Sequence, residues 1–198
     1  MAQTPPPQKN VKPSAEGLAA AATAATKKGP PPVHLWNPAF CGDLDMEIRR
    51  DGTWFYLGTP IGRQPLVRLF ASILKREGDS YFLVTPVEKV GIRVADVPFI
   101  AVDAEATGAG PTQTLTFTTN VGDTVTASAD NPLRVTRDAT GEPSPYVHIR
   151  RGLEARIDRK TFYRLIDIAS HAPHQGEDWL GLWSAGTFFP IIPMTELP

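Results

Sequence analysis

The stretch MEIRRDGTWFYLGTPIGRQPLVRLFASIL, residues 46 to 74, joins a predicted hairpin to a predicted helix. Apolar and polar residues alternate on both sides of Asp51-Gly52, a dipeptide that favours a type I′ turn between two antiparallel strands. A helix is expected from Gln64 to Glu77, because Pro65 suits a first helical turn and apolar residues recur at helical spacing. These apolar residues form one stripe that we expect to be buried: Leu66, Leu69, Phe70, Ile73 and Leu74. The stretch therefore predicts a sheet with a helix packed on it.

The rest of the chain alternates short β-type segments with turn residues, and a second helix is expected from Arg159 to Ser170. The expected strands are residues 81–84, 87–94, 99–104, 112–119, 123–127, 133–136, 146–150 and 179–184. The order of strand, arginine pair, glycine turn, strand and helix occurs twice, once after Ile48 and once after Ile149. The sequence therefore predicts an α+β fold of two halves. It has a repeated hairpin-then-helix unit, and its sheets are mostly antiparallel and each packed by one helix.

Residues 1 to 32 differ in composition from the remainder of the 198 residues. They hold seven of the 20 prolines and an alanine run, and they contain no aromatic residue. Such a segment buries too little apolar surface to offset the entropy of ordering it, so we expect a disordered tail. The body then divides into an N-terminal α+β domain, residues 33–97, and a C-terminal α+β domain, residues 98–198.

The body that begins at Val33 is net acidic although it holds 16 basic residues, of which 13 are arginine. A net acidic body argues against general nucleic-acid binding, whereas arginine suits two-pronged contacts to carboxylate or phosphate. No run of about 20 apolar residues exists, so no membrane-spanning helix is expected. The single cysteine, Cys41, excludes an intramolecular disulfide and fits a reducing, cytoplasmic location.

The segment GTPIGR, residues 58 to 63, shares only its glycines with a nucleotide-binding P-loop. A P-loop ends in Gly-Lys followed by Ser or Thr, whereas Arg63 and Gln64 take those places here and Pro60 lacks an N–H. The sequence therefore disfavours nucleotide hydrolysis. A small carboxylate or phosphate at the helix N-terminus, near Arg63 and Arg68, is compatible with it, and an ordinary strand-to-helix turn with solvated arginines is the alternative.

Other candidate catalytic or metal-binding groups have ordinary structural interpretations. Cys41 needs a nearby histidine to act as a nucleophile, and a lone cysteine is usually buried and inert. Asp43 and Asp45 share one face of a strand, but neither a calcium loop nor a supporting histidine follows them. His171 and His174 flank the expected end of the second helix, where the helix dipole alone favours histidine. The sequence thus predicts no catalytic residue, no metal and no cofactor.

Two basic clusters lie on predicted strands. Arg150 and Arg156 are expected to face each other across a hairpin, where like charges repel unless a counter-charge neutralises them. Lys89 and Arg93 are four residues apart, so on a strand they share one face. Glu154 or other internal carboxylates can neutralise these groups, and an anionic ligand is the alternative partner.

Four segments of the body resemble the bacterial family called domain of unknown function 1285. They are WNPAFCGDLDMEI, DGTWFYLGTPIGRQPLVRLF, LVTPVEKVGIRVADVPF and PYVHIRRGLEARIDRKTFY, and they lie between Trp36 and Tyr163. The resemblance implies two α+β domains with a repeated motif and no established activity. The roles suggested for that family are ligand binding and a link to signal transduction.

These observations together predict a protein that binds a small anionic ligand, a carboxylate or a phosphate, between its two halves, with a link to signal transduction. The expected ligand contacts are Arg63, Arg68, Lys89, Arg150 and Arg156, with Tyr146 and Trp54 as walls. One alternative is a protein-interaction module that binds a protein partner through its sheet edges and its tail. The other is a cysteine-dependent enzyme that uses Cys41, although the residues favour binding over catalysis.

Overall fold

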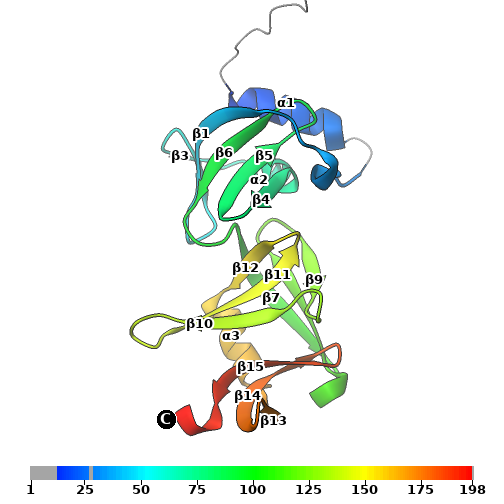
Figure 1. The fold of residues 1–198 in the computed structure, drawn as a ribbon, viewed down its shortest axis with the longest axis vertical. Coiled ribbons are helices and arrows are strands. Elements are labelled where there is room, and N and C mark those ends of the chain that lie inside the picture. Colours follow the sequence, from blue (N-terminus) through cyan, green and yellow to red (C-terminus); the bar gives the residue numbers. More distant parts are fainter. Residues whose placement is uncertain (1–12, 27–28, 198) are drawn as a thin grey trace, which may run out of the picture.

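The protein consists of two halves that follow one another along the long axis of the molecule (Figure 1). The computed structural model describes residues 13–26 and 29–197, so residues 1–12 and 27–28 of the expected tail lie outside the described residues. Each half contains a six-stranded sheet, and a three-stranded sheet lies at the far end of the second half. The predicted α+β fold with two halves is confirmed.

The elements of the first half are two α-helices, one 3₁₀ helix and six strands. They are α1 (Ala15–Thr26), η1 (Val33–Leu35), β1 (Phe40–Ile48), β2 (Trp54–Tyr56), β3 (Thr59–Pro60), α2 (Gln64–Ser72), β4 (Leu74–Glu77), β5 (Ser80–Val84) and β6 (Lys89–Val94). The elements of the second half are β7 (Phe99–Thr107), η2 (Gly110–Thr112), β8 (Thr114–Thr119), β9 (Thr124–Thr126), β10 (Leu133–Arg137), β11 (Pro143–Arg150), β12 (Leu153–Ile157), α3 (Arg159–Ile166), β13 (Ser170–His174), β14 (Glu177–Ser184), β15 (Thr187–Pro193) and η3 (Met194–Glu196).

The two large sheets share one topological feature. The first is ordered β3-β2-β1-β6-β5-β4 and the second β10-β11-β12-β7-β8-β9. In each sheet the first and last strands along the chain pair in parallel at the centre, and the other neighbours are antiparallel. The hairpin-then-helix unit is present twice, as β1 and β2 before α2 and as β11 and β12 before α3.

The helices are shorter than their apolar spacing predicts. Helix α2 ends at Ser72, because residues 74–77 pair with β5 as strand β4. Helix α3 ends at Ile166, and the residues beyond it become β13 instead of a further helical turn. The gain from pairing with a neighbouring strand, which local spacing does not reveal, overrides helical periodicity at both ends.

The Asp51-Gly52 turn is not of type I′. Its loop has three residues, closed by the Arg49 N–H donating to the Thr53 carbonyl at 2.9 Å, and within it only Gly52 has a positive φ, of 82°. Type I′ geometry occurs instead at other two-residue turns, where both central residues are left-handed. These turns are Leu57-Gly58, Arg151-Gly152, Gln175-Gly176 and Ala185-Gly186.

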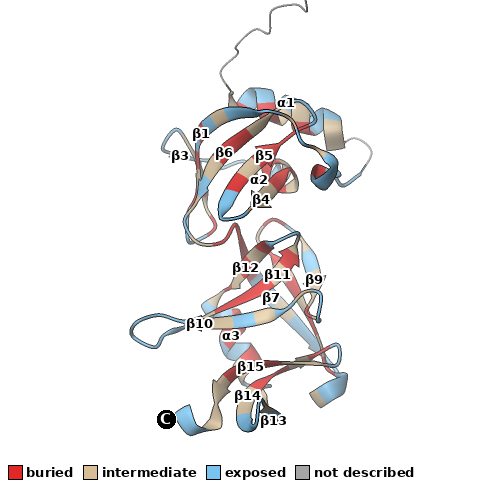
Figure 2. Ribbon diagram, viewed as in Figure 1, coloured by how far each residue is buried: buried red, intermediate tan, exposed pale blue. Residues whose placement is uncertain are grey.

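The expected disordered tail is wrong for residues 15–26, which form helix α1. The Ser14 hydroxyl caps its start by accepting from the Gly17 N–H at 3.1 Å. Leu18 and Ala22 are fully buried and join the core of the first half, where α1 packs on α2 (Figure 2). Tertiary packing of one apolar stripe therefore stabilises a helix that is too short to persist alone.

We expect Leu18→Asp to detach α1 without unfolding the two sheets. A carboxylate cannot be buried without a partner in this apolar contact, whereas undocking one terminal helix exposes it at a lower cost. Amide hydrogen exchange should show protection lost in residues 15–26 and retained in β1 and β6. Ala20→Asp, at an exposed position of the same helix, is the matched control. Equal protection of α1 in both variants would contradict the docking.

The small sheet is joined to the second half by a buried hydroxyl. Ser184 is fully buried at the end of β14, where it donates to the Ala127 carbonyl at 2.7 Å and accepts from the Leu115 N–H at 2.9 Å. The second half therefore packs α3, the large sheet and the small sheet around one core. Among the described helices, none is long and apolar enough to cross a membrane.

Candidate functional site

The boundary between the two halves is held by side chains that reach across it. Three arginines donate to carbonyl groups of the opposite half: Arg76 to Gly152 at 3.2 Å, Arg150 to Ala71 at 2.9 Å, and Arg156 to Arg50 at 2.9 Å. Arginine suits this task, because its guanidinium presents several N–H groups in a rigid plane. The halves are therefore connected by directional polar contacts as well as by packing.

Arg150 is the best fixed of these arginines. Besides the Ala71 carbonyl, its guanidinium contacts the carboxylate of Asp123, and it lies 5.0 Å from the ring centroid of Phe99. Ala71 is on α2 of the first half, whereas Asp123 and Phe99 belong to the second. These contacts from two halves hold the guanidinium in one orientation at the boundary.

A cavity of about 430 Å³ lies beside Arg150, and we call it the boundary cavity. The chain contributes Pro31 and Arg68 to it from the first half, and Asp123, Arg150 and Arg151 from the second. Three guanidinium groups thus face one carboxylate. Arg68 and Arg151 are exposed, and among the described residues neither has a hydrogen-bond acceptor or an ion-pair partner. The cavity therefore carries an excess of positive charge that the protein itself leaves uncompensated.

Two of the predicted ligand contacts, Arg68 and Arg150, meet in the boundary cavity. Arg63 does not line it, although it immediately precedes α2. The expectation that Arg150 and Arg156 face each other is wrong. The two-residue turn Arg151-Gly152 pairs Arg150 with Leu153, so Arg156 lies three residues farther along β12, opposite Tyr146.

Lys89 lies elsewhere, on the face of the first sheet with Arg93. Its ammonium is 3.0 Å from a carboxylate oxygen of Glu77 and 4.9 Å from the ring centroid of Phe82. Hydrogen bonds from Lys75 and Lys89 hold the pKa of Glu77 below its usual range. Arg93 is likewise paired with Asp45, at 2.8 Å. Internal carboxylates thus already compensate this basic cluster, which is the ordinary interpretation of its spacing.

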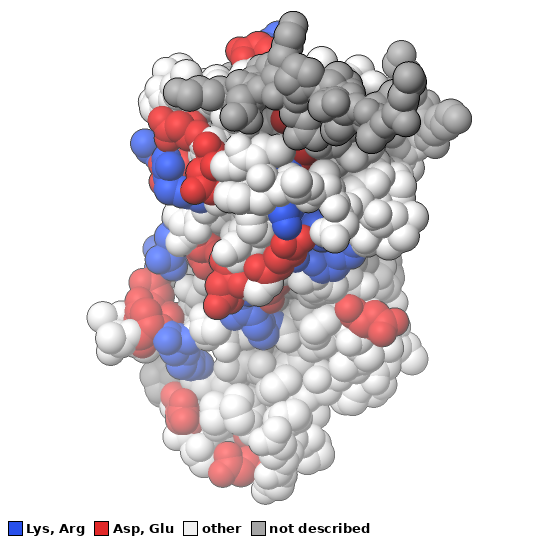
Figure 3. Space-filling view, turned by 45° about the horizontal axis from the view of Figure 1, so that its top comes forward, with Lys and Arg blue, Asp and Glu red and all other residues white. Residues whose placement is uncertain are grey.

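Arg156 lines another cavity on the boundary, with Arg50 and Arg159. Three acidic residues, Asp138, Glu142 and Asp158, also line it, and Glu142 accepts from Arg159 at 3.2 Å. Positive and negative groups are therefore mixed at this place. Figure 3 shows the same intermixing of acidic and basic side chains along the middle of one face of the molecule.

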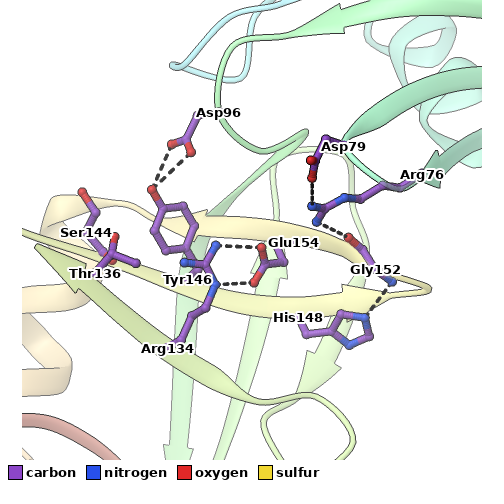
Figure 4. Close-up of polar contacts among 10 residues, drawn as sticks. All are labelled: Arg76, Asp79, Asp96, Arg134, Thr136, Ser144, Tyr146, His148, Gly152 and Glu154. Carbon is purple, nitrogen blue, oxygen red and sulfur yellow. Dashed lines mark hydrogen bonds and ion pairs between the residues drawn. The ribbon is translucent and has the colours of Figure 1, made fainter. Parts of the chain in front are cut away.

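The two aromatic walls expected from the sequence do not line the boundary cavity. Trp54 is only 1% exposed and stacks on Phe70 in the core of the first half, with ring centroids 6.4 Å apart. Tyr146 donates to both carboxylate oxygens of Asp96 at 3.2 Å, and the Arg134 guanidinium lies 4.1 Å from its ring centroid (Figure 4). Both rings have structural partners within the protein, so we do not assign either of them as a wall of the ligand site.

Arg134 belongs to a polar network on the surface of the second sheet. It forms two parallel hydrogen bonds of 2.7 Å to Glu154, and the carboxylate raises the pKa of the guanidinium further above its usual value. Figure 4 also shows Arg76 bridging Asp79 and the Gly152 carbonyl, while His148 accepts from the Gly152 N–H at 3.0 Å. The contacts of Arg76 and His148 with Gly152 hold the β11–β12 turn that carries Arg151.

Among the described residues, the structure gives Cys41 no histidine partner for nucleophilic catalysis, and it does not bring His171 and His174 together as metal ligands. Cys41 is exposed, contrary to the expectation of a buried cysteine, and its thiol donates to the Ala39 carbonyl at 3.3 Å. No described hydrogen bond joins it to a histidine. His171 and His174 lie on β13, where residues three apart point to opposite faces. Within the described part of the chain, no group of three His, Cys, Asp or Glu side chains is placed to hold a metal.

Asp123 and Arg151 are the charged residues of the boundary cavity that were not expected as ligand contacts from the sequence. Arg151 has a φ of 47° and occupies the tip of the β11–β12 hairpin, which points its side chain to the boundary. An arginine before a glycine between two strands is a signal for this turn. Nothing local marks Asp123, because its role comes from the spatial approach of β11 to the loop before β9.

Comparison with protein families gives two matches that together span most of the chain. Residues 31–97 match the N-terminal domain described as a domain of unknown function (DUF1285), and residues 98–191 match the C-terminal domain described as a protein of unknown function (DUF1285). No curated protein matches the chain.

Two solved structures are similar to this chain. A DUF1285 family protein from Silicibacter pomeroyi DSS-3 is 62% identical, with a TM-score of 0.83 over 91% of this chain and 97% of that one. A DUF1285 family protein from Shewanella baltica OS155 is 32% identical, with a TM-score of 0.49 over 63% of this chain and 91% of that one.

Proposed function

The chain belongs to the DUF1285 family, and we propose that it binds a small anion, a carboxylate or a phosphate, in the boundary cavity. The observation that carries this proposal is the uncompensated charge of Arg68 and Arg151 beside the fixed guanidinium of Arg150. An arginine that faces a cavity without a carboxylate partner gains most from an anionic guest. The volume of about 430 Å³ also falls within the range of small-molecule sites.

The position between the halves gives the ligand a physical consequence. An anion that contacts Arg68 of the first half and Arg151 of the second makes an additional bridge across the boundary. Such a ligand stabilises the observed arrangement of the halves in proportion to its affinity. The proposal includes a link to signal transduction, because a ligand that changes how firmly the two halves are held together can report its own presence to a partner. It also includes a cytoplasmic location.

Arg68→Ala is expected to weaken anion binding by about tenfold or more, because a charge-assisted hydrogen bond contributes about 1.5–3 kcal/mol. Titration calorimetry with sodium phosphate, acetate and citrate provides the measurement. Arg68 is exposed on α2, so the variant should fold normally.

The matched control is Arg63→Ala, which removes the same charge from an exposed position outside the boundary cavity. It should leave anion affinity within about twofold of the parent protein, apart from long-range screening effects. Equal losses in both variants would attribute the binding to net charge. Failure of every anion to bind below about 1 mM would remove the proposal altogether.

A protein-interaction role is the second candidate, and two exposed apolar side chains favour it. Leu35, at the end of η1, is 72% exposed, and Phe40, the first residue of β1, is 54% exposed. Large apolar side chains that are exposed on a surface are a common feature of contact sites for other proteins. Capture of a partner by the parent protein but not by Leu35→Ser would support this role in place of anion binding.

A further inference from the structure

A second cavity of about 360 Å³ adjoins the boundary cavity, and we call it the apolar cavity. The two share Arg151 as a common wall. Other walls of the two cavities come from neighbouring segments of the chain, since Pro31 and Ser72 line the boundary cavity whereas Val33 and Leu74, each two residues farther on, line the apolar cavity. The two spaces therefore form one elongated recess along the boundary of the halves.

The apolar cavity differs from the boundary cavity in its charge balance. Besides the shared Arg151, it contains the side chains of Lys75 and Arg76, and both of these are already paired. The Lys75 ammonium contacts Glu77 and the Trp36 carbonyl, at 3.0 and 3.3 Å. The Arg76 guanidinium donates to the Gly78 carbonyl at 2.8 Å and to the Gly152 carbonyl at 3.2 Å.

Because these charged ends are turned to internal acceptors, the side chains present their aliphatic stems to the recess. Val33 and Leu74 supply further apolar surface, and His34 is the exposed residue at the rim. The recess therefore has two chemically distinct ends. One end carries arginines without acceptors, and the other carries hydrocarbon and compensated charge.

From this asymmetry we infer that the ligand is an amphiphilic anion. Its carboxylate or phosphate lies against Arg68, Arg150 and Arg151, and its hydrocarbon body extends into the apolar cavity. The inference rests on the proposed function, since it assigns the ligand class of the same site. It adds that the ligand's apolar surface contributes to its affinity. A bare inorganic anion has no such surface.

The test compares octanoate with acetate and with 1-octanol, each titrated by calorimetry into the full chain. Octanoate is expected to bind at least about tenfold more tightly than acetate, because each buried methylene adds to affinity. It should also bind at least about tenfold more tightly than 1-octanol, which lacks the anionic group.

Two variants separate the ends of the recess. Arg151→Ala should weaken octanoate and acetate alike. His34→Asp, at the exposed rim of the apolar cavity, should reduce octanoate affinity by about fivefold or more and leave acetate affinity within about twofold, because it places a carboxylate beside the hydrocarbon body.

The outcomes distinguish the inference from the proposed function. Equal affinities for octanoate and acetate would overturn the amphiphilic ligand and leave the anion site standing. If octanoate, acetate and phosphate all fail to bind, both the amphiphilic ligand and the anion site are overturned. Tighter binding of an N-acetylated tripeptide ending in leucine than of octanoate would overturn the assignment by identifying a peptide terminus as the ligand.

Discussion

Replacing Phe70 with alanine is expected to lower the free energy of unfolding by about 3–5 kcal/mol. Phe70 is fully buried on α2, and its ring stacks on Trp54 with a centroid separation of 6.4 Å. The substitution removes this contact and leaves a cavity between the helix and the first sheet, which close packing cannot refill without strain. Urea unfolding followed by tryptophan fluorescence measures the loss.

The same substitution should also weaken the anion site. Phe70 anchors α2, and the next residue, Ala71, offers the carbonyl that fixes Arg150 at the boundary. Val87→Ala is the control, because Val87 is 76% exposed and its truncation should change stability by less than about 0.5 kcal/mol. A loss below about 1 kcal/mol for Phe70→Ala would show that α2 is not packed on the sheet as described.

The fold was largely predictable from the sequence because its local signals agree with its global arrangement. Alternation in strands and a helical stripe around Phe70 both point to one packed face. The predicted helix ends differ from the observed ones. Residues 74–77, for example, gain more from pairing with β5 than from a further helical turn. Helix α1 was missed for the same kind of reason, as the burial of Leu18 depends on α2 and not on its own segment.

The site was predictable only in part. Residue type indicated an arginine-rich anion site, and the structure brings Arg68 and Arg150 into one cavity. The sequence does not reveal which basic side chains have internal partners. Lys89 is not a ligand contact for this reason, because Glu77 compensates its charge. The sequence also does not distinguish an aromatic residue that lines a pocket from one in the core, and Trp54, an expected wall of the ligand site, stacks on Phe70 in the core.

Gly52→Ala is expected to lower the free energy of unfolding by about 2–4 kcal/mol, through two separable effects. Gly52 has a φ of 82°, a left-handed conformation that costs an L-residue about 1–2 kcal/mol. An added Cβ would also lie 2.7 Å from Cγ1 of Ile100 and 2.8 Å from Nδ2 of Asn120. Both neighbours belong to the second half, so the methyl group would push the halves apart or force these side chains to move.

Gly58→Ala separates the two effects. Gly58 has a φ of 73° but no atom within 4 Å of an added Cβ, so its substitution costs only the backbone strain. The excess loss in Gly52→Ala over Gly58→Ala, expected to be about 1–3 kcal/mol, measures the contact between the halves. The Asn120 side chain makes this contact directional, since it donates to the Gly52 carbonyl at 3.4 Å and accepts from the Ile100 N–H at 3.0 Å. If both variants lose the same stability in urea unfolding, the halves do not meet at Gly52, and a ligand site that depends on their contact loses its structural basis.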